Sequence, residues 1–239
     1  MKKIFLDVGG HEGQTLEEVL KPDYRFDAVH CFEPQPEYCE HIRRNFSARI
    51  ADGKLFAHSF GLADFDGERL LYGKGIGASV FSDKEDIDNA VSARCSFVRA
   101  SAFFAEHIGK EDLAVMKLNC EGGEVLILRD LIKSGAVHSL ANAMIDFDIR
   151  KIPSRRSEEK KITTEMAAAG FKNYTTASRS MVGFTHQERI RFWLSNLDCA
   201  DEFMKLTPGE EKMRMLPFWM RRRIQKIRRK IKKIKTARL

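Results

Sequence analysis

In IFLDVGGHEGQT, residues 4–15, an apolar run leads into a glycine turn. Residues 4–8 predict a strand, and the residues after Gly13 predict the start of a helix. Gly9 allows a tight backbone turn, and Gly13 allows the helix start to approach a ligand closely. The spacing differs from the dinucleotide fingerprint Gly-x-Gly-x-x-Gly and from a phosphate loop, which needs Lys-Ser or Lys-Thr. Alone, this stretch is compatible with a ligand site or with a purely structural turn.

The rest of the chain alternates between short apolar runs and amphipathic stretches. We predict strands at residues 4–8, 28–33, 55–62, 113–118, 141–147, 171–175 and 190–194. We predict helices at residues 14–21, 36–46, 124–134 and 157–169, the last closed by Gly170. A small glycine-rich excursion is expected at residues 68–73 with 79–82. This order predicts an α/β fold with a Rossmann-like, seven-stranded, mostly parallel sheet and helices on both faces. Ligands of such sheets bind beyond the carboxyl ends of the strands.

A second signal is Glu33, which ends the predicted strand 28–33 and lies 20 residues after Gly13. An acid at about this distance, at the end of the second strand, can accept hydrogen bonds from both hydroxyls of a ribose. Pro34 and Pro36 then stop the strand and begin a helix. The alternative is a solvated acid in a turn, and the glycine turn upstream favours the ribose interpretation.

A third signal is KLNCEGGE, residues 117–124, where the predicted strand 113–118 ends. Glu121 and Glu124 flank a Gly-Gly turn into a helix, and a carboxylate so placed can orient a hydroxyl or accept its proton. The competing interpretation is ordinary acidic charge at a helix N-terminus. It applies to Glu124 more than to Glu121, which lies in the turn.

In four blocks the sequence resembles the FkbM-type S-adenosylmethionine-dependent methyltransferases, over about residues 4–148. The family pattern Asp-Val-Gly-Ala-Asn-x-Gly is similar to DVGGHEG at 7–13, and Phe-Glu-Pro occurs at 32–34. Ala-Leu-Gly-Asp-x-x-Gly is similar to GLADFDG at 61–67, and Lys-Ile-Asp-Val-Glu-Gly-Ala-Glu to KLNCEGGE at 117–124. Four blocks in the same order are far more specific than any one of them. His11 stands where the family has Asn, and Asn119 where it has Asp.

The resemblance implies that the chain binds S-adenosylmethionine as methyl donor, and no metal site is evident in the sequence. The residues that would shape the methionine end of the donor pocket, or lie beside it, are Asp7, Gly9, Gly10, Gly13 and Asn119. The residue that would hold the ribose is Glu33. The residues that would flank the adenine are Leu62, Ala63 and Asp64.

Methyl transfer is an in-line displacement at a sulfonium carbon, so the enzyme supplies mainly proximity and alignment. A neutral hydroxyl also benefits from a base as it attacks. Glu121 is the first candidate for this catalytic base. Asp146, Asp148 and His11 are weaker candidates, the two aspartates because they lie at the end of the predicted strand 141–147. His186 is expected in a late turn, as a surface histidine.

The C-terminal tail carries the positive excess of the chain. Of the 41 Lys and Arg residues, 13 lie after Glu211, and no Asp or Glu lies there. Residues 1–211 therefore contain the other 28 Lys and Arg residues and all 34 acidic residues, a net charge of −6. Isoleucines spaced 3, 4 and 3 apart form an apolar stripe on a basic helix, at Ile224, Ile227, Ile231 and Ile234. An anionic membrane surface, reached through residues 216–239, suits this pattern best because aromatic residues precede it. A nucleic-acid contact and a short coiled coil are the alternatives.

These observations predict a methyltransferase domain at residues 1–205 and a basic amphipathic helix at residues 212–239. The resemblance and the tail together favour O-methylation of a sugar hydroxyl on a lipid-linked, glycolipid or surface-polysaccharide precursor. The alternatives are an RNA methyltransferase that grips with the tail, and a degenerate module that only binds the donor. Five cysteines without a Cys-x-x-Cys pair predict reduced thiols in the cytoplasm. The tail adds a peripheral location on the inner face of the cell membrane.

Overall fold

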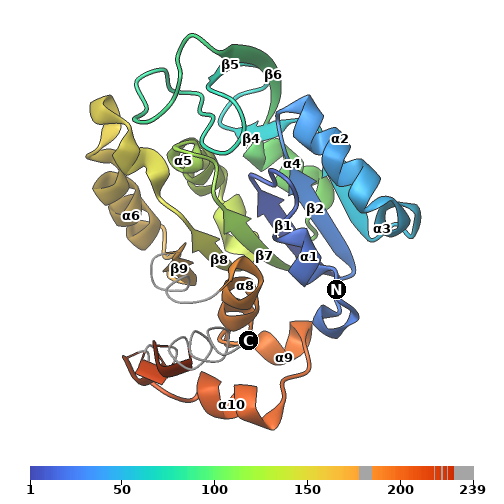
Figure 1. The fold of residues 1–239 in the computed structure, drawn as a ribbon. Helices are drawn as coiled ribbons and strands as arrows, with labels where there is room; N and C mark the ends of the chain where they lie inside the picture. Colours follow the sequence, from blue (N-terminus) through green and yellow to red (C-terminus); the bar gives the residue numbers. More distant parts are fainter. Residues whose placement is uncertain (178–184, 218, 222, 225, 229–239) are drawn as a thin grey trace, which may run out of the picture.

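The computed structural model describes residues 1–177, 185–217, 219–221, 223–224 and 226–228, and its centre is a parallel sheet of six strands (Figure 1). Their order is β3-β2-β1-β7-β8-β9, and every neighbouring pair is parallel. The strands are β1 (Lys3–Val8), β2 (Ala28–Phe32), β3 (Leu55–His58), β7 (Leu113–Leu118), β8 (Leu140–Ile145) and β9 (Tyr174–Thr176). The predicted α/β fold with a mainly parallel sheet is therefore confirmed.

A second, mixed sheet of three strands lies beyond the carboxyl ends of the first (Figure 1). It consists of β4 (Gly61–Ala63), β6 (Ser92–Arg99) and β5 (Gly67–Tyr72), in this order. Strand β4 runs parallel to β6, and β5 runs antiparallel to it. The loop between β5 and β6 contains residues 75–80, which we call the roof loop because all of them except Ser79 line the pocket described below.

Helices cover both faces of the large sheet (Figure 1). One face packs against α4 (Ala100–His107), α5 (Glu124–Ser134) and α6 (Glu158–Ala168). The other packs against α1 (Leu16–Val19), α2 (Pro36–Asn45), α8 (His186–Leu194) and α9 (Ala200–Phe203). Further helices are α3 (Ser47–Ala51), α10 (Pro208–Arg214) and the 3-10 turns η1 (Pro22–Tyr24), η2 (Ala136–Ser139), η3 (Asp148–Lys151) and η4 (Pro153–Arg155).

The central strands are apolar on both sides because both faces of the sheet are covered. In β1, Ile4, Leu6 and Val8 are buried in the core under α4, α5 and α6. Phe5 is buried in the opposite core, with α1 and α8. Side chains alternate along a strand, so Asp7 lies on the same face as Phe5. This alternation brings a charged residue into the interior at the carboxyl end of β1, where Asp7 is 0% exposed.

The predicted strand at residues 190–194 is wrong, because this segment belongs to helix α8. A capping box begins the helix: the Thr185 hydroxyl accepts from the Glu188 N–H, and the Glu188 carboxylate accepts from the Thr185 N–H. Ile190, Trp193 and Leu194 are buried at helical spacing, a pattern that a five-residue window cannot separate from strand alternation. In the described part of the chain, the large sheet has six strands rather than the predicted seven.

The predicted third strand at residues 55–62 is also incorrect, because the chain divides there between the two sheets. Leu55–His58 forms β3 at the edge of the large sheet, and Gly61–Ala63 forms β4 in the small one. The small sheet also contains Ser92–Arg99, a strand that our sequence analysis missed. By contrast, the helix at residues 124–134 is confirmed at both ends, and Gly170 takes the left-handed φ of +77° that suits the end of a helix.

Candidate functional site

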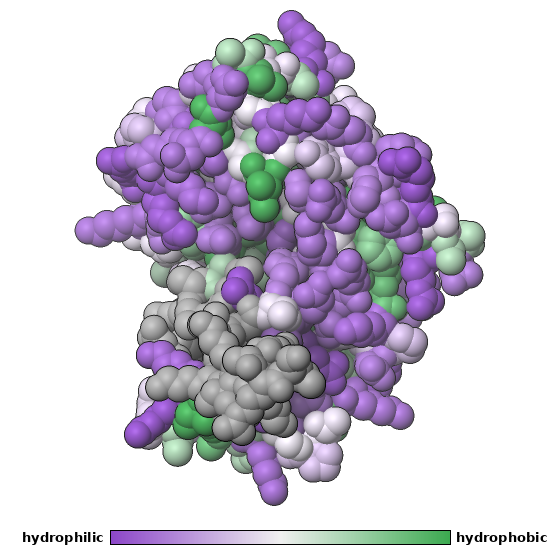
Figure 2. Space-filling view, in the orientation of Figure 1, coloured by the Kyte–Doolittle hydropathy of each residue, from purple (hydrophilic) through white to green (hydrophobic). Residues whose placement is uncertain are grey.

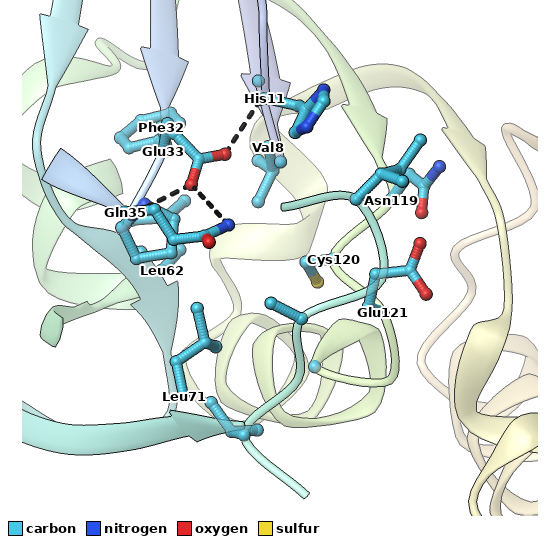
Figure 3. Close-up of a pocket in the computed structure, with 18 of the residues that line it drawn as sticks. Val8, His11, Phe32, Glu33, Gln35, Leu62, Leu71, Asn119, Cys120 and Glu121 are labelled. Carbon is cyan, nitrogen blue, oxygen red and sulfur yellow. Dashed lines mark hydrogen bonds between the residues drawn. The ribbon is translucent and has the colours of Figure 1, made fainter. Parts of the chain in front are cut away.

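A pocket of about 380 Å³ opens at the carboxyl ends of β1, β2 and β7 (Figure 3). Its volume is in the range of small-molecule and cofactor sites, and its position is the usual one for parallel α/β sheets. Apolar side chains from the small sheet and nearby loops line one part, among them Leu62, Phe65, Leu71, Val80 and Phe97. Polar side chains line another part: His11, Gln14, Thr15, Lys117, Asn119 and His186.

A buried ion pair lies directly beneath the glycine turn. Asp7 and Lys117 are partners in the register of β1 and β7, and their side chains share one face of the sheet. The Lys117 Nζ lies 3.0 Å from Asp7 Oδ1 and donates a hydrogen bond of 2.6 Å to the Gly9 carbonyl oxygen. The lysine thus ties the turn after β1 to the neighbouring strand.

Gly9 and Gly10 are required by the space available at the turn. Gly9 has a φ of +82°, and a Cβ there would lie 1.8 Å from the Asn119 carbonyl oxygen. A Cβ on Gly10 would lie 2.3 Å from the Cys31 sulfur. The N–H groups of both glycines donate to the Phe32 carbonyl oxygen, at 3.1 and 3.0 Å. These two amides therefore already have partners within the protein.

Glu33 lies in the pocket wall, held by the backbone on both sides (Figure 3). Its Oε2 accepts from the His11 N–H at 2.8 Å, and its Oε1 accepts from the Gln35 N–H at 2.9 Å. Burial raises the pKa of the Glu33 carboxyl, and the two backbone hydrogen bonds oppose this effect. Oε1 also accepts from the Gln35 side-chain amide at 3.4 Å, so Oε2 is the oxygen that keeps a lone pair for a ligand.

The roof loop is attached to the pocket wall from two sides. The Gln35 side-chain oxygen accepts from the Gly75 N–H at 2.9 Å, and the Gln35 amide donates to the Gly75 carbonyl oxygen at 3.3 Å. Farther along, Lys84 Nζ donates to the Gly77 carbonyl oxygen at 2.8 Å. Ser79 Oγ donates to the Glu121 carbonyl oxygen at 2.7 Å. The loop is thus bonded to the ends of both β2 and β7.

Glu121 lines the pocket just after β7, in a left-handed backbone conformation with a φ of +54°. Its Oε2 lies 3.1 Å from Lys84 Nζ, a lysine that is itself buried. Burial and the nearby negative charge of Asp148 raise the pKa of the Glu121 carboxyl, and Lys84 lowers it. The net shift is upward, which makes this carboxylate a stronger base than an exposed glutamate.

The predicted site residues divide into two groups. Those that line the pocket are Gly9, Gly10, His11, Glu33, Leu62, Ala63, Asn119 and Glu121. Those that are not among its described lining residues are Asp7, Gly13, Asp64 and Asp148. Asp7 acts from below through Lys117, and a Cβ on Gly13 would meet the Phe46 ring at 2.7 Å, so Gly13 allows α2 to pack closely. Asp148 is buried beside Lys151, 2.8 Å from its Nζ.

Several lining residues were missed by our sequence analysis, among them Thr15, Gln35, Lys117 and His186. Lys117 could have been found from side-chain alternation, because a lysine one residue before the end of a buried strand needs an acidic partner. His186 was predicted to be a surface histidine, which is wrong because it lies in the pocket wall, 3.0 Å from the Thr15 hydroxyl. The Thr-x-x-Glu pattern of residues 185–188 is the signal of a helix start that would have placed it.

Comparison with family models, curated proteins and solved structures finds no match for this chain. Among the described residues, no group of three or more His, Cys, Asp and Glu side chains has an arrangement that could hold a metal ion.

We expect the ion pair beneath the turn to be essential for stability. Lys117→Met leaves the Asp7 carboxylate buried without its cation, and should lower the free energy of unfolding by about 3–5 kcal/mol. The double variant Asp7→Asn, Lys117→Met should recover part of this loss. Urea unfolding followed by circular dichroism measures both. Lys161→Met, which breaks an exposed pair with Glu158, is the matched control and should cost less than about 1 kcal/mol. Equal losses for Lys117→Met and Lys161→Met would contradict the assignment.

Proposed function

We propose that this chain is an S-adenosylmethionine-dependent O-methyltransferase of the FkbM type. Its acceptor is a sugar hydroxyl of a lipid-linked, glycolipid or surface-polysaccharide precursor. The observation that carries the proposal is the composition of one pocket, in which an apolar part, a buried acid and a polar part meet. These match the adenine, the ribose and the amino-acid end of the donor.

The apolar part suits a flat base. Leu62 and Ala63 come from β4, Phe97 comes from β6, and all three line the pocket. Burial of a planar ring against aliphatic and aromatic side chains stabilises a complex in proportion to the area removed from water. Glu33 is 4% exposed and offers acceptor oxygens to the ribose hydroxyls.

The polar part suits an amino-acid group. Asn119 lies where β7 ends, and its buried Oδ1 has no hydrogen-bond partner among the described residues. A buried acceptor without a partner is costly, and a ligand that donates to it removes the cost. The donor's ammonium group is such a ligand, and we assign it to Asn119.

The same strand order is typical of dinucleotide-binding domains, in which backbone amides at the first glycine turn bind a pyrophosphate. Here the N–H groups of Gly9 and Gly10 donate to Phe32, and the Gly13 N–H donates to the Gly10 carbonyl oxygen at 2.8 Å. A pyrophosphate would find these donors occupied. This arrangement favours a donor without phosphates.

In the proposed reaction the acceptor hydroxyl oxygen attacks the methyl carbon of the sulfonium, in line with the carbon–sulfur bond. The new oxygen–carbon bond forms as the carbon–sulfur bond breaks, its electron pair stays on sulfur, and S-adenosylhomocysteine leaves. Glu121 takes the hydroxyl proton as the catalytic base, since it lines the pocket and its pKa is raised. The pocket contributes mainly alignment of the two reactants.

We also propose that the tail binds an anionic membrane surface, which would place the protein on the inner face of the cell membrane. Among the described residues after α10, Met215 is 84% exposed, Trp219 is 62% exposed and Ile227 is 52% exposed. Hydrophobic atoms are visible at the lower edge of Figure 2, near α10, on a face that is otherwise mostly hydrophilic. Exposed apolar side chains beside Lys and Arg suit an anionic lipid surface. Ile231 and Ile234 lie outside the described residues.

Part of the membrane expectation concerns the mode of binding. No helix in the described part of the chain is long and apolar enough to cross a bilayer.

Donor binding provides the first test. S-adenosylhomocysteine should bind with micromolar affinity or better, and Glu33→Ala should weaken it at least tenfold, about 1.4 kcal/mol. Asp64→Ala should leave the affinity unchanged, because Asp64 is not among the lining residues. Isothermal titration calorimetry measures all three proteins. Unchanged binding in Glu33→Ala would remove the ribose assignment, and binding of a nicotinamide dinucleotide in place of S-adenosylhomocysteine would refute the proposed function.

The base is tested by turnover. With a tritiated donor and a bacterial glycolipid extract as acceptor, Glu121→Gln should lower kcat by about 10² or more, because the hydroxyl loses its proton acceptor. Affinity for the donor should stay the same. The wild-type rate should rise with pH through the raised pKa of Glu121, since the base acts only when deprotonated. Near-normal turnover in Glu121→Gln would transfer the role to Asp146, Asp148, His11 or solvent.

The tail is tested by co-sedimentation with phosphatidylglycerol vesicles. Changing the four stripe isoleucines to Ser should leave the protein in the supernatant, whereas changing them to Leu should preserve binding. The electrostatic contribution to membrane binding is about 1 kcal/mol per basic residue near the surface, and salt screens it. The apolar contribution is not screened by salt. Sedimentation of the Ser variant at wild-type level would contradict insertion of the stripe. RNA binding that follows the tail charges and raises turnover would support an RNA methyltransferase instead.

A further inference from the structure

We infer that Thr15 and His186 form the carboxylate-binding end of the donor pocket: the Thr15 hydroxyl donates to the α-carboxylate, and His186 orients that hydroxyl. This inference rests on the proposed function and specifies how the amino-acid end of the donor is recognised. It concerns a pair of residues from two segments 171 positions apart in the chain.

Thr15 is placed as a helix cap but does not act as one. It precedes α1, the position where a Thr side chain commonly accepts from a backbone N–H, and here it makes no such bond. Its hydroxyl oxygen instead lies 3.0 Å from His186 Nε2. Thr15 is 3% exposed and lines the pocket, so its hydroxyl is removed from bulk water but accessible to a ligand.

His186 is held firmly in the pocket wall by its helix. It is the first residue of α8, whose start is fixed by the Thr185–Glu188 capping box. Farther along the helix, Trp193 is buried and its Nε1 donates to the Asn142 side-chain oxygen at 3.0 Å. Gln187 reaches α1, where its amide donates to Glu17 Oε2 at 2.5 Å. The imidazole is therefore fixed relative to the N-terminal end of α1.

Several other donors at this end of the pocket already have partners within the protein. The Lys117 ammonium is bound by Asp7 and the Gly9 carbonyl, and the amides of Gly9 and Gly10 are bound by Phe32. Gln14 donates to Glu12 Oε2 at 3.2 Å. A carboxylate entering this end needs hydrogen-bond donors to replace its water. The Thr15 hydroxyl meets this need without breaking any of these bonds.

The histidine decides the direction of the hydroxyl. Burial, followed by the positive charge of Lys117, lowers the pKa of His186, so its ring is neutral near pH 7 and carries one N–H. With that proton on Nε2, His186 donates to Thr15 Oγ1, and the hydroxyl proton of Thr15 points away from the ring to the ligand. His186 is thus a positioning residue and Thr15 a binding residue. A carboxylate is the ligand group that fits, since it accepts and cannot donate.

The experiment compares two ligands that differ in the amino-acid group. S-adenosylhomocysteine has the α-carboxylate, and 5′-methylthioadenosine has the same adenosine part without it. In isothermal titration calorimetry, Thr15→Val should weaken the binding of S-adenosylhomocysteine at least tenfold, about 1.4 kcal/mol. The same variant should weaken the binding of methylthioadenosine less than twofold. Thr15→Ser keeps the hydroxyl and should behave as wild type. His186→Leu should also weaken the binding of S-adenosylhomocysteine more than that of methylthioadenosine, by a smaller factor than Thr15→Val. His186→Gln keeps a hydrogen-bond donor and should therefore retain part of the affinity for S-adenosylhomocysteine that His186→Leu loses.

Methylthioadenosine affinity also reports whether each variant keeps an intact pocket. If a variant fails to fold, the wild-type protein provides the second measurement. S-adenosylhomocysteine should shift the ring signals of His186 in an NMR spectrum, and methylthioadenosine should not. Equal weakening of both ligands, or no weakening of S-adenosylhomocysteine in Thr15→Val, would overturn the inference while leaving the proposed function intact. Failure of S-adenosylhomocysteine to bind the wild-type protein would refute the proposed function as well.

Discussion

The site depends on one contact between neighbouring strands, the buried ion pair of Asp7 and Lys117. A charge in the interior is costly unless it is paired and hydrogen-bonded, and here the lysine meets both needs by also binding the Gly9 carbonyl. The pair therefore holds the ends of β1 and β7 and the turn between sheet and helix in one arrangement. The other features of the pocket are built around this turn.

At the turn, the lysine and the backbone amides already have partners within the protein, so the groups left for a ligand are mainly hydrogen-bond acceptors. Lys117 is neutralised by Asp7, and the amides of Gly9 and Gly10 bind Phe32. The side chains that remain include Glu33, Glu121 and the unpartnered Oδ1 of Asn119. Acceptors of this kind attract hydroxyls and cations more than phosphates. A sulfonium donor with a ribose and an ammonium group matches this balance, which supports the proposed function.

The sequence predicted best those parts in which local signals agree. The helix at 124–134 has an amphipathic pattern and a glycine beyond its end. Strands 4–8 and 113–118 are apolar runs interrupted by one charged residue each, and all three elements are found where expected. The prediction failed where tertiary context decides. Ile190–Leu194 alternates like a strand over five residues, but the capping box at Thr185 makes it a helix. Residues 55–62 read as one strand because β3 and β4 are separated by only two residues. Thr15 and His186 lie 171 positions apart in the chain, so they meet only in the folded protein. No local pattern in the sequence indicates that they are partners.

The roof loop connects the two halves of the proposed chemistry. Gln35 hydrogen-bonds both to Glu33, the proposed ribose acceptor, and to Gly75 in the loop. Lys84 bonds to Gly77 in the same loop and lies 3.1 Å from Glu121, the proposed base. A displacement of the loop therefore changes the surroundings of the ribose acid and of the base together. Because Lys84 opposes the upward pKa shift of Glu121, the position of this loop also sets how readily Glu121 takes a proton. In the proposed reaction, donor binding and proton transfer would thus be coupled through one short segment between β5 and β6.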